Sequence, residues 1–413
     1  MPESTPLPVD APRPSLGRRL IQFFGLRRSM VGVLFMVILV GMGEKMAERF
    51  LPIYLLALGG GTLSVGLLNG MDNLLSALYS FPGGYLSDRL GYKRALLVFN
   101  LIAMFGYLIV ILFPSWPAVI VGSVFFLSWT AISLPATMSL VAAVLPVQKR
   151  TMGVSLHSLV RRIPMALGPM VGGALIMAYG EKDGVRLAFI VALVLGVVAL
   201  ILQQVMVEDK KTGGEAQRNP LKLLHLITPN LRNLLISDIL VRFAEQIPYA
   251  FVVIWAVKNN GITPVQFGIL TTIEMVTAML IYIPIAYLAD KNTKKPYVVT
   301  TFVFFTLFPL VLLFSRSFPA LILAFILRGL KEFGEPTRKA LIMDLAPEGQ
   351  KASVFGLYYL IRDVIVSVAA FSGALLWNVS PATNFLVAFG FGLLGTLYFA
   401  LRGKDLSSTR AAA

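Results

Sequence analysis

Apolar stretches long enough to cross a lipid bilayer recur along this chain from Val31 to Leu401. A transmembrane helix needs about 20 mainly apolar residues. The chain is 57% hydrophobic and only 14% charged, whereas a soluble domain is roughly 25% charged. We therefore expect an all-α integral membrane protein. Twelve spans are predicted, at residues 31–57, 64–87, 94–113, 117–145, 151–179, 186–207, 231–257, 265–289, 296–315, 319–343, 352–377 and 383–401.

Lysine and arginine residues are concentrated in alternate connections between these spans, and the net charge is +15. Cation-rich segments precede the first span, follow each even-numbered span, and end with Arg402 and Lys404. The other connections carry only Lys182, Arg186, Lys258 and Arg316. This distribution predicts that both termini lie in the cytoplasm. It also favours an even number of spans in a cell inner or plasma membrane, with the lipid bilayer and not nucleic acid as the partner.

A polar stretch, residues 208–219, separates the sixth and seventh spans and predicts a division into two halves. We expect a cytoplasmic N-terminal tail, an N-terminal six-helix bundle, a cytoplasmic linker, a C-terminal six-helix bundle and a cytoplasmic C-terminal tail. Their predicted ranges are 1–30, 31–207, 208–230, 231–402 and 403–413.

The two halves contain residues of matching chemistry at a constant separation. Gly66 matches Gly268 (268 − 66 = 202). The same separation relates three further pairs: Asp72 with Glu274, Pro82 with Pro284, and Asp88 with Asp290. A duplicated membrane half is the usual construction of a secondary transporter, whose substrate site lies between the halves.

The first copy of this repeat ends in the sequence Gly84-Tyr-Leu-Ser-Asp88-Arg89-Leu-Gly91-Tyr-Lys93-Arg94. It resembles the loop signature Gly-x-x-x-Asp-Arg-x-Gly-x-Lys-Arg of the major facilitator superfamily, which follows that family's second helix. The resemblance implies two pseudo-symmetric six-helix bundles that alternate in opening. It also implies a gating role for Gly84, Asp88, Arg89, Gly91, Lys93 and Arg94, with the loop Asp capping a helix of the other half. The second copy keeps Asp290, which the resemblance assigns to the same gating motif, but has Ala286 and Thr293 in place of the two glycines.

The fifth predicted span contains Gly168-Pro169-Met-Val-Gly172-Gly173. This run is similar to the end of a fifth-helix motif in proton-coupled drug exporters of the same superfamily, and so leans toward export. Small residues also let helices approach closely in a membrane, so close packing is the alternative explanation.

Seventeen ionisable residues fall near the middle of the spans, eight cations and nine anions. They are the thirteen candidates named below with Lys45, Arg162, Asp238 and Lys331. Charges inside a membrane usually face a cavity or one another, and the near balance predicts mutual pairing. Arg338, Lys339 and Asp344 are instead expected to be charges at the cytoplasmic end. The candidates for substrate binding or proton coupling are Glu44, Glu48, Arg49, Asp72, Arg161, Arg242, Glu245, Glu274, Arg328, Glu332, Glu335, Arg362 and Asp363.

Glu44 and Glu48 are one helical turn apart, so their carboxylates share a face and repel. Either a cation lies between them or one carboxyl is protonated. A titrating carboxyl beside a movable arginine suits proton coupling, and Arg49, Arg242 or Arg362 could supply that arginine. The run from Glu44 to Phe50 is also similar to the Glu-x-x-Glu-Arg-Phe motif of proton-coupled peptide transporters, with one extra residue between the glutamates.

Three classes of function are compared for such a chain. The first is a monomeric secondary active transporter that moves a polar, charged or amphiphilic small organic solute, with the proton or alternatively sodium as coupling ion. Export by antiport and import by symport both stay open, with a lean to export. The second is a membrane sensor with the same fold. The third, an enzyme, is not expected, since the chain has no cysteine, two histidines and no metal-ligand spacing; neither a metal nor a cofactor is predicted.

Overall fold

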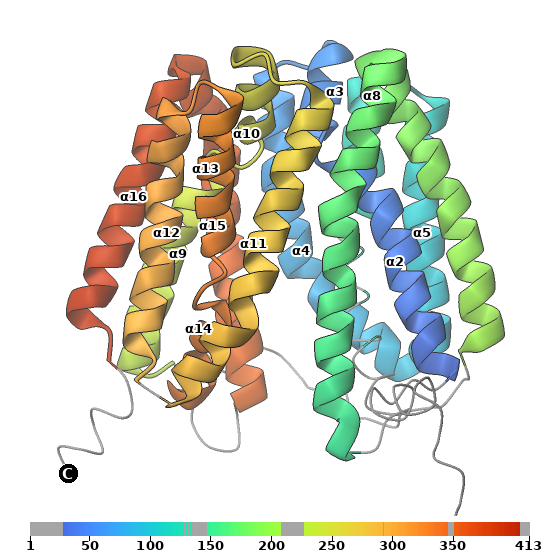
Figure 1. The fold of residues 1–413 in the computed structure, drawn as a ribbon. Helices are drawn as coiled ribbons and strands as arrows, with labels where there is room; N and C mark the ends of the chain where they lie inside the picture. Colours follow the sequence, from blue (N-terminus) through green and yellow to red (C-terminus); the bar gives the residue numbers. More distant parts are fainter. Residues whose placement is uncertain are drawn as a thin grey trace, which may run out of the picture.

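The computed structural model describes residues 28–127, 129, 133, 137, 147–207, 227–291, 293–345 and 351–404. These residues form helices joined by short turns, and no strand occurs among them. Figure 1 shows the helices running side by side in two groups, one from each half of the sequence. The prediction of an all-helical protein is therefore confirmed.

The N-terminal half contains α2, α3, α4, α5, α6 and α8. Their bounds are Arg28–Glu48, Leu51–Ala57, Thr62–Leu90, Tyr92–Leu112, Trp116–Phe126 and Val147–Met206. The C-terminal half contains α9 to α16 with one π-helix, η2. These run Pro229–Gln246, Phe251–Ile254, Trp255–Asn259 (η2), Pro264–Lys291, Lys295–Phe314, Phe318–Leu330, Glu335–Leu345, Lys351–Val379 and Pro381–Arg402.

Seven helical segments of the described chain are long and apolar enough to span a membrane. One of them, Val160–Met206, contains most of two predicted spans, because α8 bends at Gly180 (φ 82°). Other predicted spans coincide with helices that are broken or that carry several charges, such as α2 with α3. Most of residues 128–146 lie outside the described residues. The count of twelve and the five predicted domain ranges therefore stay predictions.

Turns that require glycine repeat between the halves. Gly59 (φ 85°) ends the first pair of helices, and Gly261 (φ 65°) occupies the same place in the second half (261 − 59 = 202). Gly91 (φ 80°) is the only residue between α4 and α5. A positive φ is easily reached only by glycine. The separation of 202 found in the sequence thus describes two copies of one structural turn.

Helices in both halves are interrupted near the centre of the molecule. α2 and α3 are separated at Arg49 and Phe50, and α9 and α10 at residues 247–250, where Pro248 cannot donate a helical hydrogen bond. α13 and α14 are separated at residues 331–334. Non-helical backbone at membrane depth occurs where it is buried in protein or lines a cavity, so these breaks indicate where a site lies.

The two halves contact each other through α4 with α15 and α8 with α11. The matched glycines of the repeat lie at these two contacts. A β-carbon on Gly66 would approach the side chain of Ala374 on α15, and one on Gly268 would lie 2.6 Å from Met170 Cα on α8. These glycines therefore let the halves pack with their backbones close together.

Gly268→Ala is expected to destabilise the protein by about 1–3 kcal/mol, because the added methyl group overpacks this contact. It would lie 2.7 Å from the carbonyl oxygen of Pro169, a backbone atom that cannot turn aside. Gly390→Ala is the control, because nothing lies within 4 Å of its β-carbon position. That control should be neutral or stabilising, since alanine favours a helix. Thermal unfolding of the purified protein measures both, and equal midpoints would contradict the packing argument.

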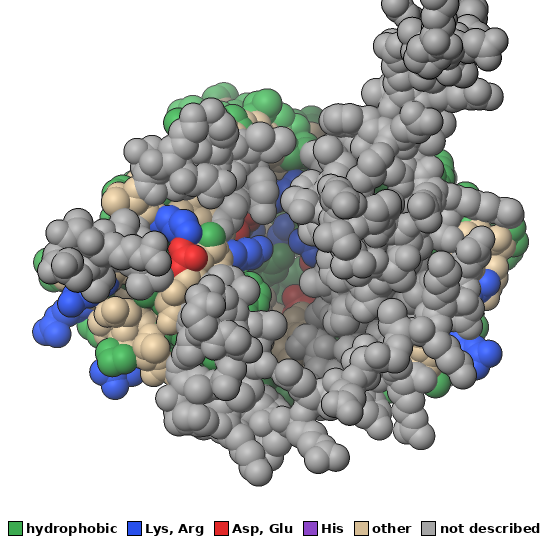
Figure 2. All heavy atoms as spheres, turned by 90° about the horizontal axis from the view of Figure 1, so that it is seen from below, with side chains coloured by type: hydrophobic (Ala, Val, Ile, Leu, Met, Phe, Trp, Pro, Cys, Tyr) green, Lys and Arg blue, Asp and Glu red, His purple; other side chains and the backbone are tan. Residues whose placement is uncertain are grey.

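The molecule is closed at one end and hollow at the other. α2 begins and α16 ends at the same end (Figure 1). Figure 2 shows that this end is hollowed at its centre, where Lys, Arg, Asp and Glu side chains are visible between the two halves. At the opposite end α3 packs against α10. There, Lys258 also forms an ion pair of 2.5 Å with Glu181 across the halves.

Candidate functional site

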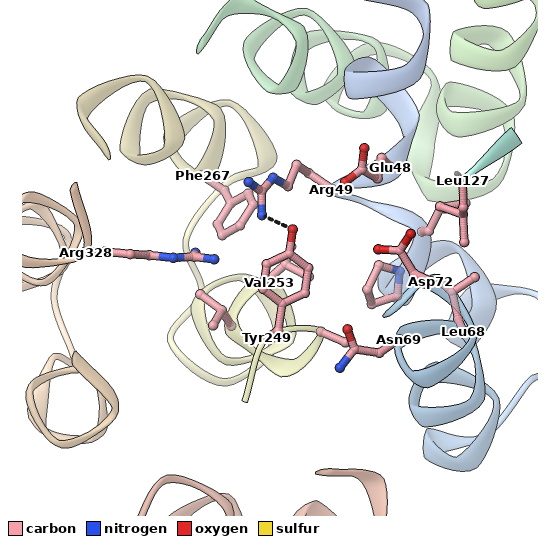
Figure 3. A pocket seen from close by; sticks show the side chains of 14 residues that line it. Glu48, Arg49, Leu68, Asn69, Asp72, Leu127, Tyr249, Val253, Phe267 and Arg328 are labelled. Carbon is pink, nitrogen blue, oxygen red and sulfur yellow. Dashed lines mark hydrogen bonds between the residues drawn. The ribbon is translucent and has the colours of Figure 1, made fainter. Parts of the chain in front are cut away.

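A pocket lies between the two halves at the level of the broken helices (Figure 3). Its empty volume is about 490 Å³, including the part that is open. Both halves contribute lining residues: Glu48, Arg49, Leu51, Pro52, Leu68, Asn69, Asp72 and Leu127 from the first, and Tyr249, Ala250, Val252, Val253, Phe267 and Arg328 from the second. Apolar walls with a few charged groups are typical of a site for a small organic molecule.

Tyr249 lies between two arginines in this pocket. Arg49 donates a hydrogen bond of 2.8 Å to the Tyr249 hydroxyl, and its guanidinium lies 5.3 Å from the ring centroid. The guanidinium of Arg328 lies 5.6 Å from the same centroid (Figure 3). Both distances suit a cation–π contact. Tyr249 thus joins cations from the two halves across the pocket.

Arg49 and Asp72 differ from the other charged residues of the pocket. Arg328 pairs with Glu274 at 3.3 Å and Glu48 pairs with Lys45. Neither Arg49 nor Asp72 forms an ion pair with any residue that the structure describes. In Figure 3 the Asp72 carboxylate points toward the pocket from α4, while Arg49 enters it from the break between α2 and α3.

The amides of α4 connect the pocket to the break in the second half. Asn69 donates a hydrogen bond of 3.0 Å to the backbone oxygen of Gln246. Asn73 donates one of 3.1 Å to the Gln246 side chain. These bonds satisfy polar groups that the end of α9 would otherwise leave unpaired, and they hold the two halves together beside the pocket.

Lys45 lies between the two glutamates of α2. Its ammonium group is 3.2 Å from Glu44 and also pairs with Glu48. Of the two alternatives expected for these carboxylates, the structure has the intervening cation. Arg161 on α8 is close enough to Glu44 to interact electrostatically.

A second, larger set of charges forms a chain through the C-terminal half. Lys331 lies 3.5 Å from Glu274 and 2.7 Å from Glu245. Arg242 then connects Glu245, at 2.6 Å, with Glu335, at 3.4 Å. The chain continues from Glu335 through Arg338, Asp238 and Arg362 to Asp363. We call these nine residues the C-terminal charge network.

The expectation for Arg338 is wrong. Its side chain is 1% exposed and pairs with both Asp238 and Glu335. It therefore belongs to the C-terminal charge network and is not an end charge. The break at residues 331–334 explains the difference, because α14 begins a new helix that turns Arg338 toward the interior. Lys339 is 46% exposed, and Asp344 pairs with Lys294, as expected for end charges.

Glu332 lies in the break between α13 and α14 and has a partner outside the C-terminal charge network. It pairs at 3.3 Å with Arg162 on α8, so this contact joins the halves. The predicted candidates thus form a pocket group (Glu48, Arg49, Asp72, Arg328), Glu44 with its neighbour Arg161, the members of the C-terminal charge network, and this bridge.

The gating segment is described only in part. α4 continues to Leu90 and Gly91 makes the tight turn into α5. Lys93 donates a hydrogen bond of 2.9 Å to the backbone oxygen of Gln204 at the end of α8. Arg94 is exposed. The side chains of Asp88, Arg89 and Asp290, and the surroundings of Gly84, lie outside the described residues, so the predicted helix cap stays a prediction.

Several residues of the site were not in the candidate set. Tyr249, Asn69 and Gln246 are uncharged and were missed for that reason; the break at Pro248 was the available signal for Tyr249. Asp238, Lys45 and Lys331 were recognised as charges inside spans but not as site residues. Among the described residues, no three His, Asp or Glu side chains are grouped so that they could hold a metal ion.

The comparisons with known proteins agree with this architecture. The family model described as Major Facilitator Superfamily matches residues 33–237 and 234–412. The uncharacterized MFS-type transporter MJ1317 of Methanocaldococcus jannaschii is 24% identical over 361 residues, which cover 84% of this chain and 87% of the relative.

Two solved structures show the same fold. A mutant form of the nucleoside transporter NupG has a TM-score of 0.77 at 13% identity, and the match covers 91% of this chain and 100% of that transporter's chain. A D-xylose-proton symporter has a TM-score of 0.71 at 12% identity, covering 91% of this chain and 98% of the symporter's. The chain therefore has the fold of these transporters.

Proposed function

Because this chain belongs to the major facilitator superfamily, we propose that it is a proton-coupled secondary active transporter of a polar, charged or amphiphilic small organic solute. The observation that carries the proposal is the pocket shared by the two halves, closed at one end and approached by a hollow at the other. A site between two repeats, reached from one side at a time, is the arrangement that alternating access needs.

Opening the closed end requires a defined set of contacts to break. The bonds from Arg49 to Tyr249 and from Asn73 to Gln246, and the ion pair of Lys258 with Glu181, all connect one half to the other. Each is a single polar contact that water can replace. Rocking of the halves about the pocket would exchange these contacts for others at the hollow end.

Shared cations support the coupling part of the proposal. Lys45 is shared by Glu44 and Glu48, and Lys331 by Glu245 and Glu274. If one carboxylate of such a set takes up a proton, the cation is left with the other, and the local pairing changes. A change of pairing that accompanies proton uptake is what links a proton to a conformational state.

We place the protein in the cell inner or plasma membrane with both termini in the cytoplasm, because cations gather at the hollow end. Lys93, Lys294, Lys295 and Arg402 all belong to helix ends on that side. In this orientation the hollow faces the cytoplasm. The run Gly168–Gly173, which favoured export in the sequence, gives no further support for that direction. Gly168 and Gly172 pack against Lys45 and Met46 of α2, as the alternative of close helix packing expects.

Reconstituted proteoliposomes test the proposal directly. Labelled amino acids, nucleosides, sugars, organic cations and lysolipids are offered with an imposed pH gradient of either sign. We expect one class of solute to accumulate against its own gradient only while the pH gradient lasts. The sign of the pH gradient that drives this accumulation then shows whether the protein imports or exports the solute. Accumulation driven by a sodium gradient alone would show that sodium, and not the proton, is the coupling ion. No movement of any class would contradict transport and favour a sensor.

A further inference from the structure

The pocket presents two opposite charges that have no ion-pair partner in the described chain. Arg49 and Asp72 both line it, and both lack the ion pair that Glu48 and Arg328 have. An ionised group at membrane depth is costly unless a counter-charge or water reaches it. Charged groups that the fold leaves unpaired at a cavity are therefore placed for a charge that comes from outside the chain.

We propose that the pocket binds a zwitterionic solute, with Arg49 taking the anionic group and Asp72 the cationic group. This inference rests on the transporter function proposed above and names the chemical class of its solute. The planar guanidinium of Arg49 is suited to a carboxylate or phosphate. In the structure it is occupied only by the neutral hydroxyl of Tyr249, which an anionic group can displace.

Single-charge solutes fit these two residues less well. A simple anion would satisfy Arg49 but would lie near the carboxylates of Asp72 and Glu48. A simple cation would satisfy Asp72 but would share the pocket with Arg49 and Arg328. A molecule with both charges can orient so that each end meets its opposite.

The rest of the pocket lining indicates what kind of spacer joins the two charged groups of the solute. Leu68, Leu127, Val253 and Phe267 add an apolar wall to the pocket around the charged groups (Figure 3). Such a wall accommodates a short aliphatic spacer and offers few hydrogen bonds to a polyhydroxylated one. An amino acid with separated charges and the ethanolamine phosphate of a lipid headgroup share this chemistry.

Binding to the purified full-length protein in detergent tests the proposal without a pH gradient. The probes are 4-aminobutyrate with its single-charge analogues butyrate and butylamine, and lysophosphatidylethanolamine for the lipid source. We expect 4-aminobutyrate or lysophosphatidylethanolamine to bind at least tenfold more tightly than either analogue. Tighter binding of 4-aminobutyrate would identify a free solute, and tighter binding of lysophosphatidylethanolamine would identify a lipid headgroup. Equal binding of the single-charge analogues would overturn the proposal.

Two variants assign the charges to the two residues. Arg49→Gln should weaken zwitterion and butyrate binding about tenfold or more, the loss of a charge-assisted bond, and leave butylamine unchanged. Asp72→Asn should weaken zwitterion and butylamine binding and leave butyrate unchanged. Arg232→Gln and Asp183→Asn alter exposed charges outside the pocket and serve as matched controls. A general structural role would weaken all probes alike in both variants, which would overturn the assignment.

Failure of this proposal is distinguishable from failure of the transporter function. If gradient-driven transport occurs but binding does not distinguish zwitterions, only the solute class is wrong. If zwitterions bind selectively but no solute crosses the membrane, transport is wrong while the pocket assignment stands.

Discussion

Arg338→Gln should lower the free energy of unfolding by about 3–5 kcal/mol, because it removes the nearest cation of two buried carboxylates. Asp238 and Glu335 then keep only longer ion pairs, such as those to Arg362 and Arg242, each 3.4 Å. Arg338 is 1% exposed and pairs with Asp238 and Glu335, which lie on different helices. Tyr358 donates a hydrogen bond of 3.0 Å to Asp238 and cannot replace the lost positive charge. Thermal unfolding of the purified protein, monitored by intrinsic fluorescence, measures the change.

Lys339→Gln provides the matched control for this prediction. Lys339 is adjacent in sequence and also faces Glu335, at 3.5 Å, but it is 46% exposed. A surface change of this kind usually alters stability by less than about 0.5 kcal/mol. The double variant Asp238→Asn with Arg338→Gln should recover part of the loss, because it removes both charges of the pair. Equal stability of the Arg338 and Lys339 single variants would contradict the buried charge network.

Glu48→Gln should reduce the solute accumulation that the pH gradient drives by tenfold or more, while the protein still folds. Glu48 shares Lys45 with Glu44 and also lines the pocket, so it connects the shared cation to the solute site. Lys45 keeps Glu44 as a partner at 3.2 Å in the variant, so no cation is left unpaired. We therefore expect loss of coupling without loss of fold.

Two transport assays on the Glu48 variant separate these effects. Accumulation against the solute gradient should be lost, whereas exchange of labelled for unlabelled solute at equal pH should continue. Asp183→Asn, an exposed carboxyl at the closed end, should leave both activities intact. Unchanged accumulation in the Glu48→Gln variant would refute its coupling role and direct the search to Glu245 or Glu274.

Much of the fold could be predicted from the sequence because lipid imposes a length and a polarity on every span. The separation of 202 predicted the matched halves, and Gly59 with Gly261 shows that the turns correspond as well. The breaks within helices were not predicted. Pro52, Pro248 and Pro336 mark all three, since Pro248 lies in a break and the other two are the second residue of the helix that follows one.

The candidate site could be predicted only as a set of charges. Apolar surroundings identify an ionisable residue such as Asp238 as costly, but not its partner, which lies 100 residues away at Arg338 (338 − 238 = 100). Tyr249 carries no charge, so nothing in its residue type distinguished it from packing tyrosines. Which charges stay unpaired, Arg49 and Asp72 among them, depends on the helix arrangement and not on spacing along one helix.

Rocking of the two halves about the pocket changes the distances between them at both ends of the molecule, and paired spin labels measure those distances. The chain has no cysteine, so two introduced cysteines label without background. Asp183→Cys with Asn259→Cys reports the closed end, and Leu90→Cys with Thr293→Cys the hollow end; all four positions are exposed. We expect acidification or a bound solute to add a population in which the first distance lengthens and the second shortens. A single unchanged population at both ends, in protein that still transports, would contradict rocking of the halves.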